Sequence, residues 1–313
     1  SFSSKIMRGY NSYEKSLFGS GILHCIAFAV VFVYLVIFFR KYCVYKKTHS
    51  MSKELLWFGI LGAISFNICA LTGAFLLFAM IGVINVNHEA ALVYGQGFLW
   101  HFGQMNSYLY LLNRLYIGFK GTQFALSRTV FIGLIILLVI YLIFCLVYVE
   151  LIIYCILDDN SMEMPIHRNI RLISVAVHTC IDCILSYTLL RLFIVKLYKV
   201  GETLYDTNTF ELIDLSKNVD VIHCDDDGNN EIKQHRDNIF AVIAKVGILG
   251  VIMIILSQLM LMSILLYKIL DLKWIHALFI WFETFHVFIV PLCLLFGFDF
   301  TREWYNIFCL CCH

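Results

Sequence analysis

Long apolar tracts alternate with short polar clusters along most of the chain. A helix that crosses a bilayer needs about 20 predominantly apolar residues. Seven tracts meet this requirement. The sequence therefore predicts an all-α polytopic membrane protein, folded as a bundle of seven transmembrane helices. The predicted spans are Gly21–Phe39, Leu55–Ile84, Ala91–Phe119, Thr129–Leu157, Leu172–Tyr198, Ile239–Leu270 and Trp274–Phe298.

The polar stretches divide the chain into three parts. We expect residues 1–20 to form a short extracellular tail and residues 21–298 to form the transmembrane domain. Within this domain, the long polar stretch 199–238 is expected to be a solvated cytoplasmic loop, because it cannot bury enough apolar surface to fold alone. Residues 299–313 form the third part.

This third part has apolar residues at positions 300, 304, 307 and 308, which repeat with helical spacing. The pattern predicts a short amphipathic helix that lies in the membrane interface. Three cysteines follow directly, at a depth that suits reversible S-palmitoylation. The alternative is that they are free terminal thiols. These residues are Cys309, Cys311 and Cys312.

Composition supports the membrane assignment. Of 313 residues, 61% are hydrophobic and only 14% are charged, whereas soluble domains carry roughly 25% charged residues. The net charge of +1 gives no indication of a nucleic-acid partner. Most of the 12 cysteines lie inside apolar tracts, without zinc-ribbon spacing, so we interpret them as buried small hydrophobic residues.

Lysine and arginine indicate the orientation, because cytoplasmic loops are enriched in them. The connections after the first, third and fifth spans are basic, whereas residues 85–90 contain no lysine or arginine. We therefore expect the N-terminus outside and the C-terminus in the cytoplasm, with the plasma membrane as the location. The basic residues of the first connection are Arg40, Lys41, Lys46, Lys47 and Lys53.

Several ionisable or amide side chains fall inside the predicted spans. A charged side chain at a helix centre costs about 2.5–3.5 kcal/mol on insertion scales, so these residues should face the bundle interior. His178 and Asp182 share one helical face, and Glu283 and His286 share another. The set predicts either a ligand pocket in the outer half of the bundle or interhelical hydrogen bonds. It comprises His101, His178, Asp182, Gln258, Glu283 and His286.

Two short segments and one further residue carry a family resemblance. Asn113-Arg114-Leu115 ends the third span, Val290-Pro291-Leu292-Cys293-Leu294 lies near the end of the seventh, and Asn67 lies within the second. With seven helices and the C-terminal segment, they resemble a divergent G-protein-coupled receptor. The resemblance implies an unknown small-molecule or peptide ligand and a cytoplasmic partner such as a G protein.

The resemblance also implies coupling residues at the cytoplasmic side. Arg114 would pair with an acid such as Asp237 and release it on activation, while Lys245 would lie at the cytoplasmic mouth of the bundle. Alternatively, Arg114 only reaches toward lipid phosphates. The sixth span lacks the proline and tryptophan of the main receptor class, and residues 274–298 contain no lysine for a retinal Schiff base. We expect no cofactor.

Two other classes remain open. A channel, a transporter or a structural subunit of a membrane assembly would also be a polytopic bundle, although the sequence has no internal repeat. An intramembrane metal-dependent hydrolase would use buried His, Asp and Glu residues. The chain contains no His-x-x-x-His or His-Glu-x-x-His pair, so the sequence predicts neither metal ligands nor catalytic residues.

Overall fold

The computed structural model describes residues 11–45, 53–84, 89–118, 126–157, 173, 176–195, 198, 226–270 and 272–298. Within these ranges the regular elements are helices and none is a strand, which confirms the all-α prediction. The labelled helices are α2 (Ser12–Tyr45), α3 (Lys53–Met80), α4 (Glu89–Gly118), α5 (Arg128–Leu157), α7 (Asp226–Leu270) and α8 (Lys273–Phe296). A further helical segment covers Ala176–Val195.

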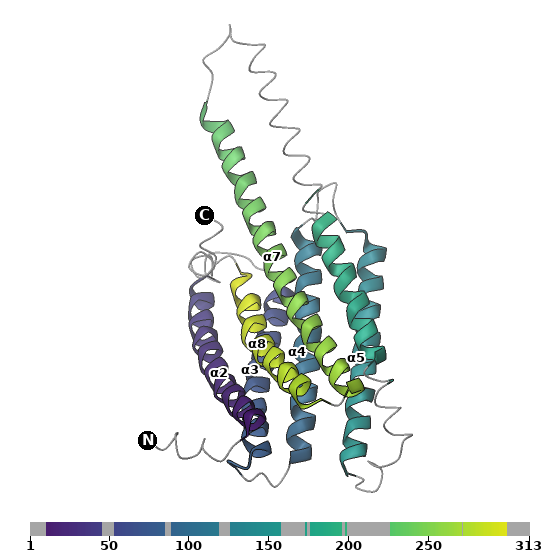
Figure 1. Ribbon diagram of the computed structural model, residues 1–313. Coiled ribbons are helices and arrows are strands. Elements are labelled where there is room, and N and C mark those ends of the chain that lie inside the picture. The colour runs from purple at the N-terminus through teal and green to yellow at the C-terminus, as the bar shows by residue number, and fades with distance from the viewer. Residues whose placement is uncertain are drawn as a thin grey trace.

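Successive helices run in alternate directions and form one elongated bundle (Figure 1). α3 packs against α2, α4 and α8; α4 also packs against α5 and α7, and α8 against α2 and α7. α4 therefore lies inside the assembly, with neighbours on several sides. The first part of α7 projects beyond the bundle at one end, and α2 begins at the other end (Figure 1).

α2 begins at Ser12, within the segment expected to be a tail. The Asn11 side chain accepts a hydrogen bond from the Glu14 backbone N–H at 2.9 Å, and the Glu14 carboxylate accepts one from the Asn11 N–H at 2.9 Å. This reciprocal pair is a capping box, which stabilises a helix start. Hydropathy marks only the membrane-crossing part of the helix, which explains the difference.

Two other boundaries differ from the expected ones. α3 stops at Met80 because Gly82 adopts a left-handed conformation (φ 70°), and the Val83 N–H bonds the Phe78 carbonyl at 2.9 Å in a Schellman motif. α7 begins at Asp226, so part of the expected 199–238 loop is helical. Residues 226–270 contain no proline, and the backbone hydrogen-bond ladder continues from the polar stretch into the apolar one.

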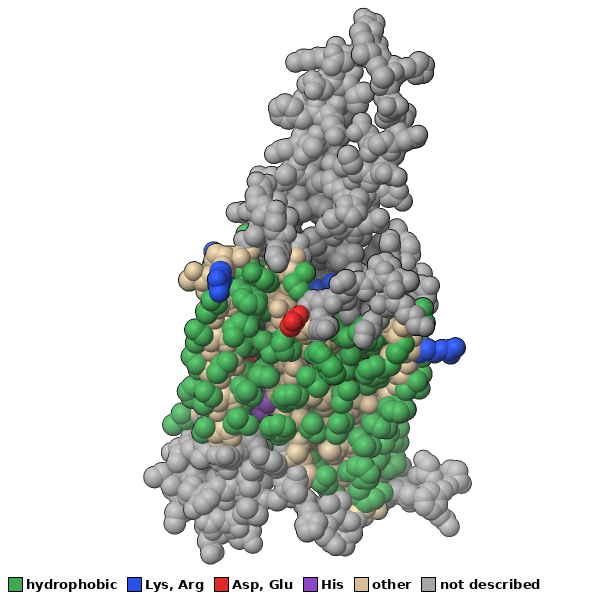
Figure 2. Space-filling view, turned by 180° about the vertical axis from the view of Figure 1, so that it is seen from behind, with side chains coloured by type: hydrophobic (Ala, Val, Ile, Leu, Met, Phe, Trp, Pro, Cys, Tyr) green, Lys and Arg blue, Asp and Glu red, His purple; other side chains and the backbone are tan. Residues whose placement is uncertain are grey.

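In the part of the chain that the structure describes, six helices are long and apolar enough to cross a membrane: α2, α3, α5, α7, α8 and the Ala176–Val195 helix. Large apolar side chains on their outer faces, such as Phe32, Val139 and Ile143, are more than half exposed. Figure 2 shows a broad hydrophobic surface over the described helices, with few charged side chains. An exposed apolar area of this extent suits lipid rather than water. The chain is an integral membrane protein.

The buried core follows the contact of α3, α4 and α8. Phe66, Leu115 and Leu294 are fully buried there. A Cβ atom on Gly103 would lie 3.0 Å from the Phe66 ring, so glycine allows this aromatic side chain to pack directly on the backbone of α4. The close packing fixes which residues of α4 face α8 and which face the remaining helices.

Candidate functional site

A hydrogen-bond network surrounds Asp182, which is completely buried. The Tyr108 hydroxyl donates to one carboxylate oxygen at 2.6 Å, and the Gln258 amide donates to the other at 2.6 Å. Ser186 bonds both donors, at 2.8 Å and 3.0 Å. The network joins α4, the Ala176–Val195 helix and α7. Both oxygens of Asp182 therefore have partners on neighbouring helices.

A second cluster lies beside this network and contains His101 of α4, Cys145 of α5 and His178 of the Ala176–Val195 helix. All three are buried, and one nitrogen or sulfur atom from each lies within 4.8 Å of the others. Cys145 Sγ is 3.4 Å from His178 Nδ1. The imidazole rings of His101 and His178 meet edge to face at 4.8 Å between centroids. We call this group the His–Cys cluster.

The Trp100 ring lies between the His–Cys cluster and His286. Trp100 contacts His101 at 4.8 Å on one side and His286 at 5.6 Å on the other, measured between ring centroids. His286 is fully buried and also contacts Phe66 at 5.0 Å. Neither of its ring nitrogens has a hydrogen-bond partner among the described residues. Such a group is costly to bury, so its position is not explained by internal bonding alone.

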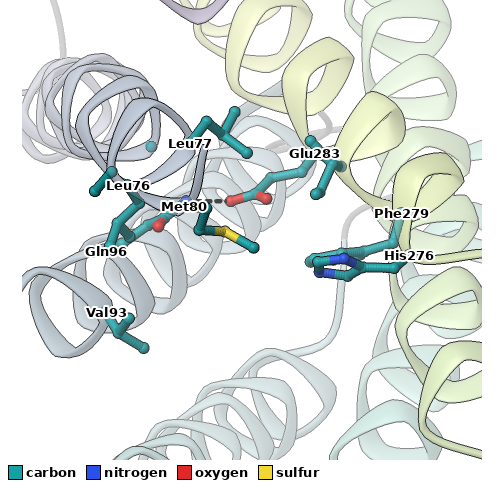
Figure 3. Close-up of a pocket in the computed structure, with 11 residues that line it drawn as sticks. Leu76, Leu77, Met80, Val93, Gln96, His276, Phe279 and Glu283 are labelled. Carbon is teal, nitrogen blue, oxygen red and sulfur yellow. Dashed lines mark hydrogen bonds between the residues drawn. The ribbon is translucent and has the colours of Figure 1, made fainter. Parts of the chain in front are cut away.

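Glu283 lies apart from these groups and lines a pocket of about 230 Å³. Its carboxylate accepts a short hydrogen bond from the Gln96 amide, drawn as a dashed line in Figure 3. The remaining wall is mainly apolar and comes from α3, α4 and α8. Its lining residues include Leu76, Leu77, Met80, Val93, His276 and Phe279. The pocket thus combines an apolar wall with one acid, one amide and one imidazole.

Further polar groups, on α2 and α8, lie close to the pocket residues Gly73 and Gln96. The Thr284 hydroxyl and the Ser20 carbonyl lie 3.1 Å and 2.9 Å from His24 Nδ1. A Cβ atom on Gly73 would lie 2.9 Å from the His24 ring and 3.1 Å from the Gln96 amide nitrogen. Glycine at this position therefore allows the side chains of α2 and α4 to approach each other across α3.

At the other end of the bundle, Arg114 binds the C-terminal end of α8. One guanidinium nitrogen donates to the Gly297 carbonyl at 2.7 Å, and Nε lies 3.4 Å from the Tyr110 hydroxyl. The guanidinium carbon is 5.5 Å from the centroid of the Phe298 ring. A carbonyl at a helix C-terminus attracts a cation, so this contact completes the end of α8.

The structure thus places the predicted site residues in separate groups. Asp182 and Gln258 bond directly, His101 and His178 are neighbours, and His286 lies beyond Trp100, while Glu283 belongs to the pocket. The side chains of Asp237 and Lys245, and the three terminal cysteines, lie outside the described residues. Sequence reasoning did not select Gln96, Tyr108, Cys145 or His276.

No family model, curated protein or solved structure matches the chain. The function is therefore inferred from the chemistry and arrangement of these groups.

Proposed function

We propose that the protein is a seven-transmembrane, receptor-like signalling protein of the plasma membrane, in which α4 crosses the membrane in addition to the six apolar helices named above. α4 has 30 residues, which at 1.5 Å per residue extend over about 45 Å and exceed the roughly 30 Å hydrocarbon core. Its apolar sequence is interrupted by buried polar residues such as His101, Gln104 and Ser107. A helix enclosed by neighbours tolerates such residues.

One observation carries this proposal: side-chain contacts join α4 to α8 at both ends of the bundle. Gln96 bonds Glu283 at the pocket, and Arg114 bonds Gly297 at the other end. From the first contact to the second, the residue number increases in both α4 and α8, so the two helices run in the same direction. Gln96 and Arg114 are separated by 18 residues, or about 27 Å of helix. A change at one contact has a direct physical route to the other.

The basic connections favour an outward-facing pocket and a cytoplasmic Arg114 contact. Glu283 is the acid that lines the pocket, and apolar side chains surround it, so a small amine with an apolar body would suit it. An ammonium group would compete with Gln96 for the carboxylate. A ligand that binds better when this contact is broken would favour a shifted arrangement of α4 and α8.

This shift would change the Arg114 contact and open the cytoplasmic side to a partner such as a G protein. Couplings between two such sites are typically 1–3 kcal/mol, comparable with the loss of one charge-assisted hydrogen bond. Lys245 and Asp237 of α7 remain candidates for the cytoplasmic cleft. Palmitoylation of the terminal cysteines would hold the C-terminal segment at the membrane surface.

The pocket is tested with a panel of small primary amines added to the full chain in lipid nanodiscs. We expect at least one amine to raise the thermal unfolding midpoint, since a ligand at 100 times its Kd stabilises by about 2.7 kcal/mol. Glu283→Gln should remove this effect. Phe285→Leu is the matched control, because Phe285 belongs to the same helix and is 44% exposed.

An identical response of wild type and Glu283→Gln, or no response to any amine, would contradict the pocket assignment. Signalling is tested separately, by nucleotide exchange on a panel of heterotrimeric G proteins in the presence of the stabilising amine. Exchange above the amine-free rate is expected. Amine-dependent ion flux into liposomes without any exchange would favour the channel class instead.

A further inference from the structure

We propose that His101, Cys145 and His178 bind one zinc ion, which joins three helices of the bundle. One nitrogen atom of each imidazole and the Cys145 sulfur already lie within 4.8 Å of one another. Tetrahedral zinc, with Zn–N bonds near 2.0–2.1 Å and a Zn–S bond near 2.3 Å, requires ligand atoms about 3.4–3.6 Å apart. The Cys145 Sγ to His178 Nδ1 distance of 3.4 Å meets this value.

The donor set selects the metal. Two imidazoles and one thiol are ligands for zinc and similar transition metals, whereas calcium and magnesium take oxygen ligands. Each ligand comes from a different helix: α4, α5 and the Ala176–Val195 helix. The ion would therefore act as a cross-link between three helices, beside the buried hydrogen-bond network of Asp182.

Charge balance supports the same site. Zinc binding converts the Cys145 thiol into a thiolate and releases one proton to the solvent. The thiolate contributes one negative charge, and the carboxylate of Asp182, one turn after His178, contributes a second. Together they neutralise the +2 charge of the ion. A neutral assembly avoids the large cost of an uncompensated ion in a medium of low dielectric constant.

A buried hydroxyl beside the cluster offers a partner for a fourth ligand. The Tyr141 hydroxyl is buried next to Cys145 and Asp182 and makes no close hydrogen bond with a described residue. The Tyr141 ring lies 5.1 Å from the His178 ring, between centroids, on the helix that carries Cys145. A water molecule in the fourth zinc position would form a hydrogen bond with this hydroxyl. This zinc site is separate from the Glu283 pocket and does not depend on the receptor proposal.

The test uses the full chain, purified without an affinity tag, treated with a chelator and titrated with Co²⁺ as the probe. We expect one equivalent to produce a thiolate-to-cobalt charge-transfer band, which Zn²⁺ then removes. Cys145→Ser should abolish the band. It should also weaken zinc binding by more than roughly 10- to 100-fold, which is the loss expected when a residue that only hydrogen-bonds a metal ligand is replaced. No band in the wild type would overturn the proposal.

Two controls exclude other thiols. Cys293→Ser replaces another buried cysteine, and a triple serine variant replaces Cys309, Cys311 and Cys312. Both variants should keep the band. If the triple variant loses the band while Cys145→Ser keeps it, the proposal is overturned.

X-ray absorption at the zinc edge of wild-type protein needs no variant, so it remains decisive if Cys145→Ser does not fold. We expect one sulfur and two imidazole nitrogens around the ion. A shell without sulfur, or with three sulfurs, would overturn the proposal.

Discussion

Replacing Gly297 with alanine tests the packing of Tyr110 and Arg114 of α4 on the end of α8. Gly297 has φ −63°, which alanine adopts without backbone strain. Its Cβ atom, however, would lie 2.0 Å from the Tyr110 hydroxyl oxygen and 3.0 Å from Cζ of the same ring. The hydroxyl must therefore move by about 1 Å or more. Tyr110 is buried, and its ring packs against Phe298, so a movement of this size disturbs the packing.

The magnitude follows from this clash. Overpacking of a buried site typically costs 1–3 kcal/mol, and we expect about 2 kcal/mol for Gly297→Ala. Tyr110→Phe removes the atom at 2.0 Å and leaves Cζ, which needs only a small adjustment. In the Tyr110→Phe background, alanine at position 297 should therefore cost less than about 1 kcal/mol.

The free energy of unfolding can be measured by adding increasing fractions of SDS to mixed micelles, for the wild type, both single variants and the double variant. The expected result is a coupling of about 1 kcal/mol or more between positions 110 and 297. If alanine at position 297 costs the same in both backgrounds, the clash does not determine the effect and the described contact is wrong.

Two further predictions concern other parts of the molecule. Tyr108→Phe removes one of the donors to Asp182 and should lower the free energy of unfolding by about 0.6–1.7 kcal/mol, which lies between the average and the maximum for interhelical hydrogen bonds in a membrane protein. The same SDS titration measures this change, and an unchanged free energy of unfolding would contradict the network. Hydroxylamine-sensitive acyl labelling in cells should be lost when Cys309, Cys311 and Cys312 are replaced by serine, whereas labelling that persists would place the lipid elsewhere.

The sequence predicts the fold class well, because the length of an apolar tract and the cost of unpaired backbone groups in lipid leave few alternatives. Six of the predicted spans correspond to helices that are long and apolar enough to cross a membrane. The crossing by α4 remains a prediction. Hydropathy does not register the parts of a helix outside an apolar tract, which is why α2 and α7 begin before the predicted spans. The Asn11–Glu14 capping box is a local signal that could have located the start of α2.

The candidate sites were only partly predictable. The cost of burying polar groups correctly indicated that His101, His178, Asp182 and His286 face the interior. It could not indicate which of them meet, because that depends on the rotation and depth of each helix in the bundle. Cys145 shows this most clearly: nothing in the sequence around it resembles a metal motif, and only the packing of α5 brings it to the two histidines.

The most direct test of the central claim is hydrogen exchange at the end of α8 after the pocket contact has been removed. Gln96→Met breaks the bond to Glu283 with little change in volume, and the Gly297 amide, which bonds the Cys293 carbonyl at 3.0 Å, reports on the far end. Mass spectrometry of the full chain in nanodiscs compares this variant with the wild type and with Phe285→Leu. If α4 and α8 form one coupled pair, amides near Gly297 exchange faster in Gln96→Met while those of the Ala176–Val195 helix do not. Faster exchange at the pocket alone, with unchanged exchange near Gly297, would contradict the coupling.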